Sequence, residues 1–277
     1  MIYYLPVLYT IKTRYSSNFK KLVYILTYIL PEAILLYLEC KEKLPLTIII
    51  PIFFISILSY INIYELGYIY NDTETIKNEN NPTKRLSDSQ LLIYEKYKIL
   101  IYFIRFIQIG ILNTVLSFFI SPKSIVWFCS IEIFTLIIYW IYNHVRGNLA
   151  MFFYFFLIST RYLSITLCAA EQFSLSVFFA ALFVFPIVRT MEYKAHYGEE
   201  SDVNLFFRKY IIKYNIQKIP VFRVWATFVL LMISFVLLIF SICDFIPFIL
   251  CMYMFLYRFS LWFAVKMGAS FKGYLKR

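Results

Sequence analysis

Acidic residues recur at a regular interval between Glu65 and Arg85. Glu65, Asp72 and Glu79 are each seven residues apart, and this spacing places them on one face if a helix continues through the segment. Mg²⁺ takes oxygen ligands, usually keeps several waters and bridges to substrate phosphates. Two of these carboxylates would suffice for a magnesium site. The alternative interpretation is a solvated loop of mixed charge beside a membrane.

Two basic residues, Lys84 and Arg85, follow this acidic run directly. The guanidinium group of arginine matches the geometry of phosphate oxygens, and a cationic pair beside a metal site suits a diphosphate. We therefore expect Lys84 and Arg85 to bind the phosphates of a substrate.

A second polar segment carries Arg189, Glu192, His196 and Glu199, which share one helical face. We expect Glu192 to be a metal ligand, and we expect Arg189 and Lys194 to bind phosphate. The alternative is a surface helix whose charges have no common purpose.

The composition requires a membrane setting for these residues. The chain has 277 residues, of which 61% are hydrophobic and 16% charged, whereas soluble domains have about 45–50% and about 25%. Eight apolar segments approach the length of about 20 residues that crosses a bilayer. They cover about 22–40, 45–70, 97–120, 124–144, 147–170, 172–191, 221–243 and 245–265. We expect an all-α polytopic bundle that forms one integral-membrane domain over residues 1–277.

Positive charge is distributed unevenly between the two sides of these segments. Of 27 Lys and Arg residues, 21 fall on the side of the termini, three lie within spans, and only Lys41, Lys43 and Lys123 fall opposite. Basic residues mark the cytoplasmic side. Both termini are therefore predicted to be cytoplasmic, in a multi-pass protein of the plasma membrane, and the net charge of +11 needs no nucleic-acid partner.

Two long loops are predicted on that cytoplasmic side, at about 71–96 and 189–220. Long loops in a compact domain are usually functional or disordered. The stretch from Val203 to Ile219 is amphipathic, and the segment 1–18 is aromatic and basic. We expect both to lie at the membrane surface.

Four charged residues, Arg105, Glu132, Arg161 and Arg258, fall within predicted spans. Each costs roughly 2.5 kcal/mol or more at mid-bilayer if it is unpaired, so such residues usually face the interior of a bundle. Arg161 is central in its span. It either pairs with Glu132 or lines a polar substrate pocket.

The first acidic segment resembles the first aspartate-rich motif of the UbiA superfamily of intramembrane prenyltransferases, Asn-Asp-x-x-Asp-x-x-x-Asp. Asn71 and Asp72 match this motif, and Glu79 replaces its last aspartate conservatively. Thr75 stands at the middle acidic position. The string Pro82-Thr83-Lys84-Arg85 resembles the corresponding segment in the branch of the family that makes decaprenyl-phosphoryl phosphoribose.

The resemblance implies a bundle of eight or nine spans around a central, lipid-accessible cavity. It implies Mg²⁺ held by Asp72, Glu79 and Glu192, which act together in catalysis, with a diphosphate bound beside them. The residues expected to bind that substrate are Asn71, Lys84, Arg85, Arg161, Arg189 and Lys194.

Three functions are compatible with these residues. In the first, an isoprenyl group passes from an isoprenyl diphosphate to an acceptor that the sequence does not name. In the second, a polyprenyl phosphate attacks phosphoribosyl diphosphate. In the third, the protein is a non-enzymatic membrane transporter or scaffold, although transport sites usually lie at mid-membrane rather than at a loop.

Overall fold

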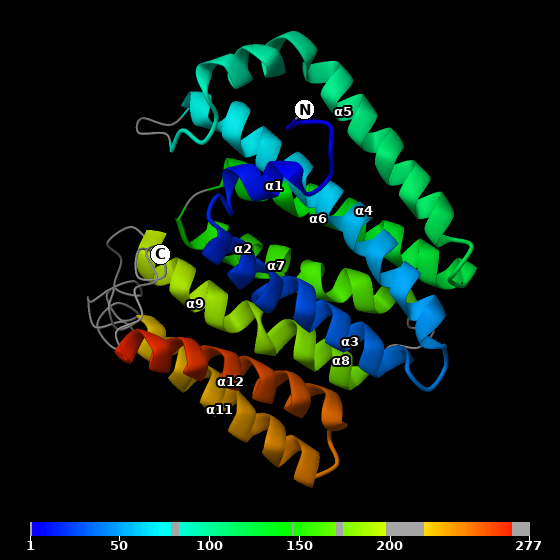
Figure 1. The fold of residues 1–277 in the computed structure, drawn as a ribbon, viewed down its shortest axis with the longest axis vertical. Helices are drawn as coiled ribbons and strands as arrows, with labels where there is room; N and C mark the ends of the chain where they lie inside the picture. The colour runs from blue at the N-terminus through cyan, green and yellow to red at the C-terminus, as the bar shows by residue number, and fades with distance from the viewer. Residues whose placement is uncertain (1, 79–82, 146, 170–173, 198–218, 268–277) are drawn as a thin grey trace. The chain divides into compact units, whose positions relative to one another are not determined.

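The computed structural model describes residues 2–78, 83–145, 147–169, 174–197 and 219–267 (Figure 1). All regular structure in these ranges is helical, which confirms the predicted all-α fold. The helices are α1 (Leu8–Thr13), α2 (Asn18–Tyr24), α3 (Leu30–Cys40), α4 (Leu46–Thr73), α5 (Asp88–Leu116), α6 (Pro122–His144), α7 (Gly147–Ala169), α8 (Leu175–Phe179), α9 (Pro186–Tyr197), α11 (Ile219–Ile239) and α12 (Phe245–Lys266). Two π-helical segments, η1 (Ile25–Ile29) and η3 (Ala180–Val184), and one 3-10 turn, η2 (Thr75–Asn78), complete the set.

Eight helices in these ranges are long and apolar enough to cross a membrane. They are Asn18–Cys40, Leu46–Lys77, Asp88–Leu116, Pro122–His144, Leu149–Cys168, Leu175–Glu192, Pro220–Ile239 and Phe245–Lys266. The eight predicted spans are thus recovered, and the protein has the build of a multi-pass membrane protein.

Both long loops are shorter in the structure than the sequence predicts. Helix α4 continues to Thr73, and α5 begins at Asp88 because Ser87 and Gln90 form a capping box, an arrangement that satisfies two backbone N–H groups at a helix start. The first loop therefore does not include residues 71–73 or 88–96. The second was wrong over 189–197, which belong to α9. The amphipathic stretch from Val203 falls almost wholly outside the described residues.

Contacts divide the chain into two compact units, each assembled from separate stretches of sequence. Unit 1 contains Met1–Tyr24, Glu39–Val145 and Ser164–Glu171, and unit 2 contains Ile25–Leu38, Arg146–Leu163 and Gln172–Arg277. Each unit holds one of the two polar segments that the sequence singles out.

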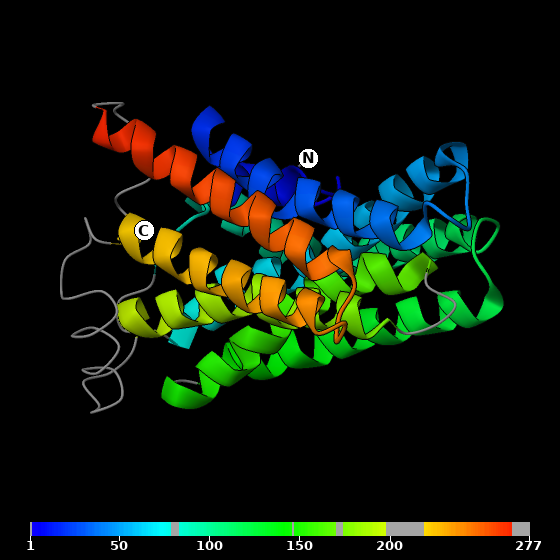
Figure 2. The same cartoon turned by 90° about the horizontal axis from the view of Figure 1, so that it is seen from below.

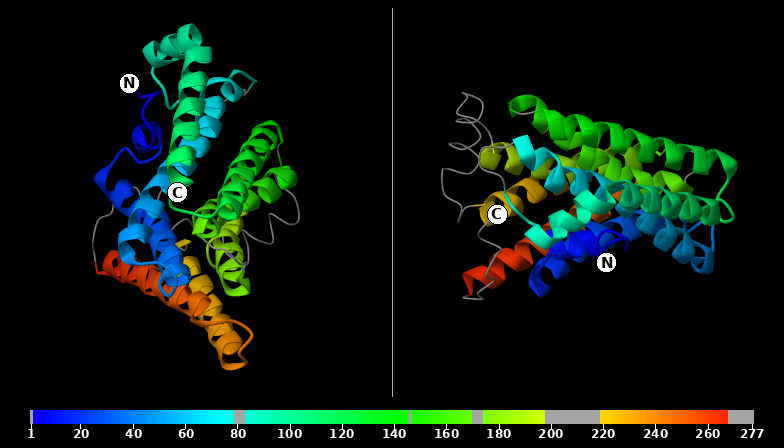
Figure 3. Two further views of the ribbon diagram at one scale, coloured as in Figure 1. Left: turned by 90° about the vertical axis from the view of Figure 1, so that its right-hand side faces the viewer. Right: turned by 90° about the horizontal axis from the view of Figure 1, so that it is seen from above.

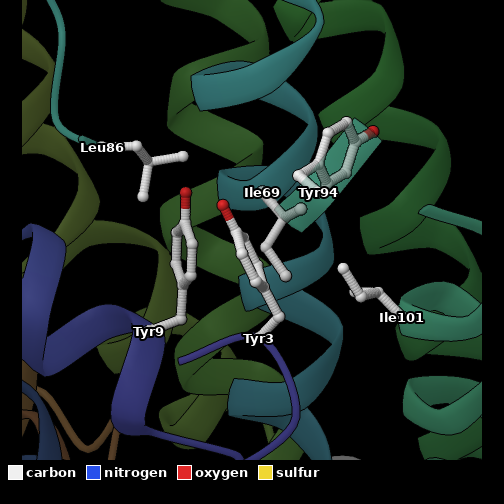
Figure 4. Packing of buried hydrophobic residues seen from close by; sticks show 6 residues of the cluster. All are labelled: Tyr3, Tyr9, Ile69, Leu86, Tyr94 and Ile101. Carbon is white, nitrogen blue, oxygen red and sulfur yellow. The ribbon is translucent and has the colours of Figure 1, made fainter. Parts of the chain in front are cut away.

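In unit 1, α4 packs against α5 and α6, and α1 lies beside α4 (Figures 1 and 3). Gly67 allows the close approach of α4 and α6, because a Cβ atom there would lie 2.3 Å from the ring of Tyr139. The segment 1–18 was expected on the membrane surface. Instead Tyr3 and Tyr9 are buried in a cluster with Ile69, Leu86, Tyr94 and Ile101 (Figure 4).

In unit 2, α11 and α12 run side by side as an antiparallel pair (Figure 2). Asp244 caps α12 by accepting a hydrogen bond from the Ile246 N–H at 2.8 Å. Helix α12 also contacts α8 and η3. These contacts bring Arg258, which lies on α12, into the interior of the unit, where the residue is 3% exposed.

Candidate functional site

Asp72 of unit 1 lies at the end of α4, with a side chain that is 0% exposed. Both Arg14 amino groups reach it, Nη1 at 2.8 Å from Oδ2 and Nη2 at 2.9 Å from Oδ1. Arg85 donates from Nη1 to Oδ1 at 3.1 Å, and the Tyr9 hydroxyl donates to Oδ2 at 2.9 Å. A buried carboxylate thus holds two guanidinium groups that come from separate parts of the sequence.

The surroundings keep these groups in the protonation states that the bonds require. Burial raises the pKa of Tyr9, and the charge of Asp72 raises it further, so the hydroxyl remains a donor. Burial lowers the pKa of Arg14, but Asp72, Tyr68 and Tyr139 together raise it by more, so the guanidinium stays charged. Burial raises the pKa of the neighbouring Tyr3 to about 12.

The other predicted ligands of this site have different fates. The Asn71 amide donates to Asp72 Oδ1 at 3.4 Å. Lys84 is exposed on the loop before α5. Glu79 lies outside the described residues.

Glu65 is one of the three regularly spaced carboxylates, two of which were expected to suffice for Mg²⁺, and the structure gives it other partners than those of Asp72. Its side chain is fully buried and forms an ion pair with Arg105 at 2.8 Å. It also accepts the backbone N–H of Thr10 at 2.6 Å and that of Val7 at 3.1 Å. Because its oxygens are engaged in this way, Glu65 joins the N-terminal segment and α5 to α4 within unit 1.

The oxygen atoms of Asp72 and Asn71 are hard donors of the kind that Mg²⁺ takes, and one or two protein carboxylates plus substrate phosphates commonly suffice for this ion. The residues present fit Mg²⁺ by the type of their oxygen donors alone: both Asp72 oxygens already contact Arg14, Arg85 or the Tyr9 hydroxyl, so the ion would share Asp72 with these groups or replace them. No group of three or more His, Cys, Asp or Glu side chains is gathered within the described ranges.

Glu192 organises the polar centre of unit 2. Arg223 grips it with two hydrogen bonds, Nε to Oε1 at 2.6 Å and Nη2 to Oε2 at 2.9 Å. Arg189 adds a bond from Nη1 to Oε2 at 3.0 Å. The predicted proximity of Arg189 and Glu192 is confirmed, since both lie on α9. The side chains of Lys194 and His196 fall outside the described part, as does Glu199.

Arg161 lies next to this centre within unit 2. Its guanidinium carbon stands 4.0 Å from the centre of the Tyr28 ring, and its Nε donates to Glu32 Oε1 at 3.2 Å. The Tyr28 hydroxyl lies 3.3 Å from Nη2 of Arg189. The suggested partner of Arg161, Glu132, was wrong: Glu132 interacts instead with Ser59 and Asn113 in unit 1.

Arg258 completes the set. Its charge acts on both Tyr28 and Glu192. Its Nε atom is buried and has no hydrogen-bond partner among the described residues, and the same is true of the Arg189 Nε. Two buried donors in one cluster therefore point to an acceptor that the described residues do not supply.

Sequence reasoning missed several members of both clusters. Arg14 and Tyr9 were assigned to a surface helix, and Glu32, Tyr28 and Arg223 were not singled out. A signal was present for Glu32 and Arg223, because charged residues near or inside apolar spans usually face a bundle interior. No comparable signal marks Tyr9 or Tyr28, because tyrosine is abundant throughout the chain, with 25 residues.

Comparisons of the chain with models of protein families, with curated proteins and with solved structures found no match.

Proposed function

We propose that this protein is an integral-membrane transferase of the prenyltransferase type, which moves an isoprenyl group from an isoprenyl diphosphate to an acceptor. The proposal combines the resemblance of the Asn71–Arg85 segment to the UbiA motif with the polar clusters of the two units. A membrane bundle supplies an apolar environment for an isoprenoid chain, and the cluster of each unit, taken by itself, supplies charged groups that suit a diphosphate.

The observation that carries the proposal is a pair of buried guanidinium donors in unit 2, the Nε atoms of Arg189 and Arg258, which have no hydrogen-bond partner among the described residues. Arg161, Arg223 and Arg258 are buried, and the side chain of Arg189 is 24% exposed. The buried carboxylates of the described part of this unit are Glu32 and Glu192. Because unpaired buried charge is costly, a cluster with two open guanidinium donors favours a multiply charged anion, and a diphosphate meets that need.

Asp72, assisted by the amide of Asn71, would hold Mg²⁺ in the proposed enzyme. When bound, the ion neutralises charge that develops on a leaving diphosphate. Within unit 1, Arg85 would bind and orient phosphate oxygens beside Asp72. Within unit 2, Arg189 and Arg258 would offer positive charge to a phosphate group. Electrostatic stabilisation of this kind is often the largest contribution to catalysis.

Phosphoribosyl transfer to a polyprenyl phosphate is the second candidate. It is favoured by the position of Arg85, the last residue of the Pro82–Arg85 string, whose guanidinium is in contact with Asp72. The two candidates differ in which substrate carries the diphosphate.

The proposal includes the orientation in the plasma membrane that the basic residues predict, with both termini cytoplasmic. The eight candidate spans found within the described residues are even in number, which agrees with this arrangement.

The decisive experiment measures Mg²⁺-dependent release of diphosphate by the purified protein. One arm supplies farnesyl or geranylgeranyl diphosphate, and the other supplies phosphoribosyl diphosphate with a polyprenyl phosphate. Release in one arm identifies the carrier of the diphosphate. Release in neither arm, with no effect of Asp72→Ala on the binding of any ligand, would overturn both enzyme functions in favour of a transporter or scaffold.

A matched pair of variants on α12 tests the role of the arginine cluster. Arg258→Gln should raise the KM for the diphosphate substrate about tenfold or more, because charged hydrogen bonds contribute about 1.5–3 kcal/mol. Lys266→Gln removes the same charge from the exposed end of the helix and should leave KM within about twofold. Equal KM values for the two variants would contradict a substrate-binding role for the cluster.

A further inference from the structure

Helix α5 bends close to its start (Figure 1). At the bend, Tyr97 has a φ of −119° and a ψ of 17°, whereas α-helical values lie near about −63° and −42°. Residues 99–116, which follow the bend, cover about 27 Å at about 1.5 Å per residue. This length is close to the hydrocarbon thickness of a bilayer, about 30 Å. Residues 88–96 therefore lie outside the hydrocarbon core when the rest of α5 crosses it.

One face of this first part of α5 is fixed on unit 1. Tyr94 is 0% exposed, and its hydroxyl donates to Glu74 Oε1 at 2.8 Å. The Lys98 ammonium forms an ion pair with the same oxygen. Because Glu74 is the residue that ends α4, these contacts hold the start of α5 against the end of α4. The direction of the segment is thus determined by packing.

The opposite face of the segment is apolar and exposed. Leu92, Lys96, Ile99 and Phe103 follow one another at intervals of four, three and four residues, which is the spacing of one helical face. Leu92 is 72% exposed, Ile99 85% and Phe103 60%. A straight α5 would carry Leu92 roughly 10 Å into water beyond Ile99. A segment that turns along the membrane surface keeps Leu92 at the boundary, where amphipathic helices bury their apolar face.

A groove opens on the surface of α5 at the bend, with a volume of about 470 Å³. Sites for small ligands have about 300–1,000 Å³. The groove is lined by Glu95, Lys96, Tyr97, Lys98, Ile99, Leu100 and Phe103. Its lining is thus charged on the side of residues 95–98 and apolar on the side of residues 99–103. This order matches a molecule with an ionic head and a hydrocarbon chain.

The charged side of the groove offers a cation to such a head. The Glu95 carboxylate is engaged by Lys77 at 2.6 Å. Lys96 is exposed and forms no ion pair among the described residues, and its ammonium lies 5.2 Å from the centre of the Tyr97 ring. Lysine and tyrosine side chains anchor proteins at the level of lipid head groups. The basic residues predict that this side is cytoplasmic, and the cytoplasmic leaflet carries anionic lipids.

We propose that the α5 groove binds an anionic phospholipid, and that residues 88–96 lie along the membrane surface. The lipid phosphate contacts Lys96, and an acyl chain follows Ile99 and Phe103 into the bilayer. No diphosphate and no transfer reaction enters this inference, so it stands or falls independently of the proposed function.

The first test is native mass spectrometry of the purified protein with phosphatidylglycerol and, separately, with phosphatidylcholine. The wild type should prefer phosphatidylglycerol. Lys96→Gln should weaken the binding of phosphatidylglycerol about fivefold, the effect of one lysine near an anionic surface, and leave that of phosphatidylcholine unchanged. Lys96→Glu should abolish the preference. Equal affinities of the wild type for the two lipids would overturn the proposal.

Lys12→Gln is the matched control. Lys12 is also an exposed lysine of unit 1, on α1, and it does not line the groove. This variant should bind phosphatidylglycerol like the wild type, and a loss equal to that of Lys96→Gln would show that net charge alone attracts the lipid. Thermal unfolding in detergent should be the same for both variants, because both side chains are exposed.

Competition distinguishes a lipid from a soluble phosphate. Inorganic phosphate and glycerol 3-phosphate, added in excess, should not displace phosphatidylglycerol, because they lack the chain that occupies the apolar side of the groove. Displacement by either compound, lost in Lys96→Gln, would assign the site to a soluble anion and overturn the proposal.

The second test locates the start of α5. A spin label at Leu92→Cys, in a cysteine-free protein in vesicles of both lipids, should be more accessible to oxygen than to a water-soluble nickel chelate. A label at Lys84→Cys, on the exposed loop before α5, should show the reverse. Preference of the Leu92→Cys label for the chelate would overturn the surface location. Protection from both reagents in a dimeric protein would mean that a second copy covers this face, and would overturn it too.

Discussion

The contacts of Glu132 with Ser59 and Asn113 in unit 1 bear on the protonation state of its carboxyl group, because each contact requires a hydrogen. Ser59 Oγ lies 2.8 Å from Asn113 Oδ1 and 2.7 Å from Glu132 Oε1, and Asn113 Nδ2 lies 2.6 Å from Glu132 Oε2. Three contacts need three hydrogens, and Ser59 and Asn113 supply one each to the ring, whichever way the amide is turned. We infer that the third hydrogen belongs to the Glu132 carboxyl group, which is then neutral.

This conclusion gives a prediction for Glu132. The free energy of unfolding of Glu132→Gln should lie within about 0.5 kcal/mol of the wild-type value, because the new amide supplies the same hydrogen as a protonated carboxyl group. Glu132→Ala leaves Ser59 and Asn113 without a shared partner and should lose about 1–3 kcal/mol. Unfolding in detergent measures both variants, and an equal loss in the two would mean that the carboxyl group is ionised.

At the scale of single elements, proline explains the irregular turns of two spans. Pro31 lacks an N–H, and its ring crowds the carbonyl four residues before it; the chain widens there into the π-helical segment η1. The freed Thr27 carbonyl accepts a hydrogen bond from the Tyr162 hydroxyl at 2.8 Å, and the adjacent Leu26 carbonyl accepts one from Tyr253 at 2.7 Å. Segment η3 likewise precedes Pro186.

A double-mutant cycle tests this account of η1. Tyr162→Phe should destabilise the protein by about 1–3 kcal/mol, because the Thr27 carbonyl loses its partner. In a Pro31→Ala background the new N–H of residue 31 can reach that carbonyl, so the same change should cost less. Thermal unfolding of the four proteins gives the coupling energy, and a coupling of zero would show that the tyrosine does not compensate for the proline.

At the scale of the whole molecule, the distribution of basic residues predicts the membrane orientation. In a cysteine-free background, Lys43→Cys and Lys123→Cys should react with a membrane-impermeant maleimide added to intact cells. Lys12→Cys and Lys77→Cys should react only after the membrane is opened, because 21 of the 27 basic residues lie on their side. Labelling of Lys12→Cys in intact cells would reverse the orientation.

Features that depend on local composition could be read from the sequence. Apolar length determined the eight spans, because burying a backbone in lipid requires long helices with few charges. Helical spacing alone placed Arg189 beside Glu192, since residues three apart are neighbours on a helix. The ends of the spans were less accurate, because the capping box at Ser87 lets α5 begin within a polar stretch.

Only the tertiary structure decided which charges meet. Glu65 and Asp72 are seven residues apart and could share one helical face. In the structure, however, Glu65 pairs with Arg105, whereas Asp72 pairs with Arg14 and Arg85. Arg161 pairs with Glu32, which is 129 positions away in the sequence. Such pairings depend on how helices cross and how a terminal segment folds back, and sequence periodicity carries no information about either. Asp72 and Arg85 were thus singled out from the sequence, while Arg14 and Tyr9 were identified as partners of Asp72 only in the fold.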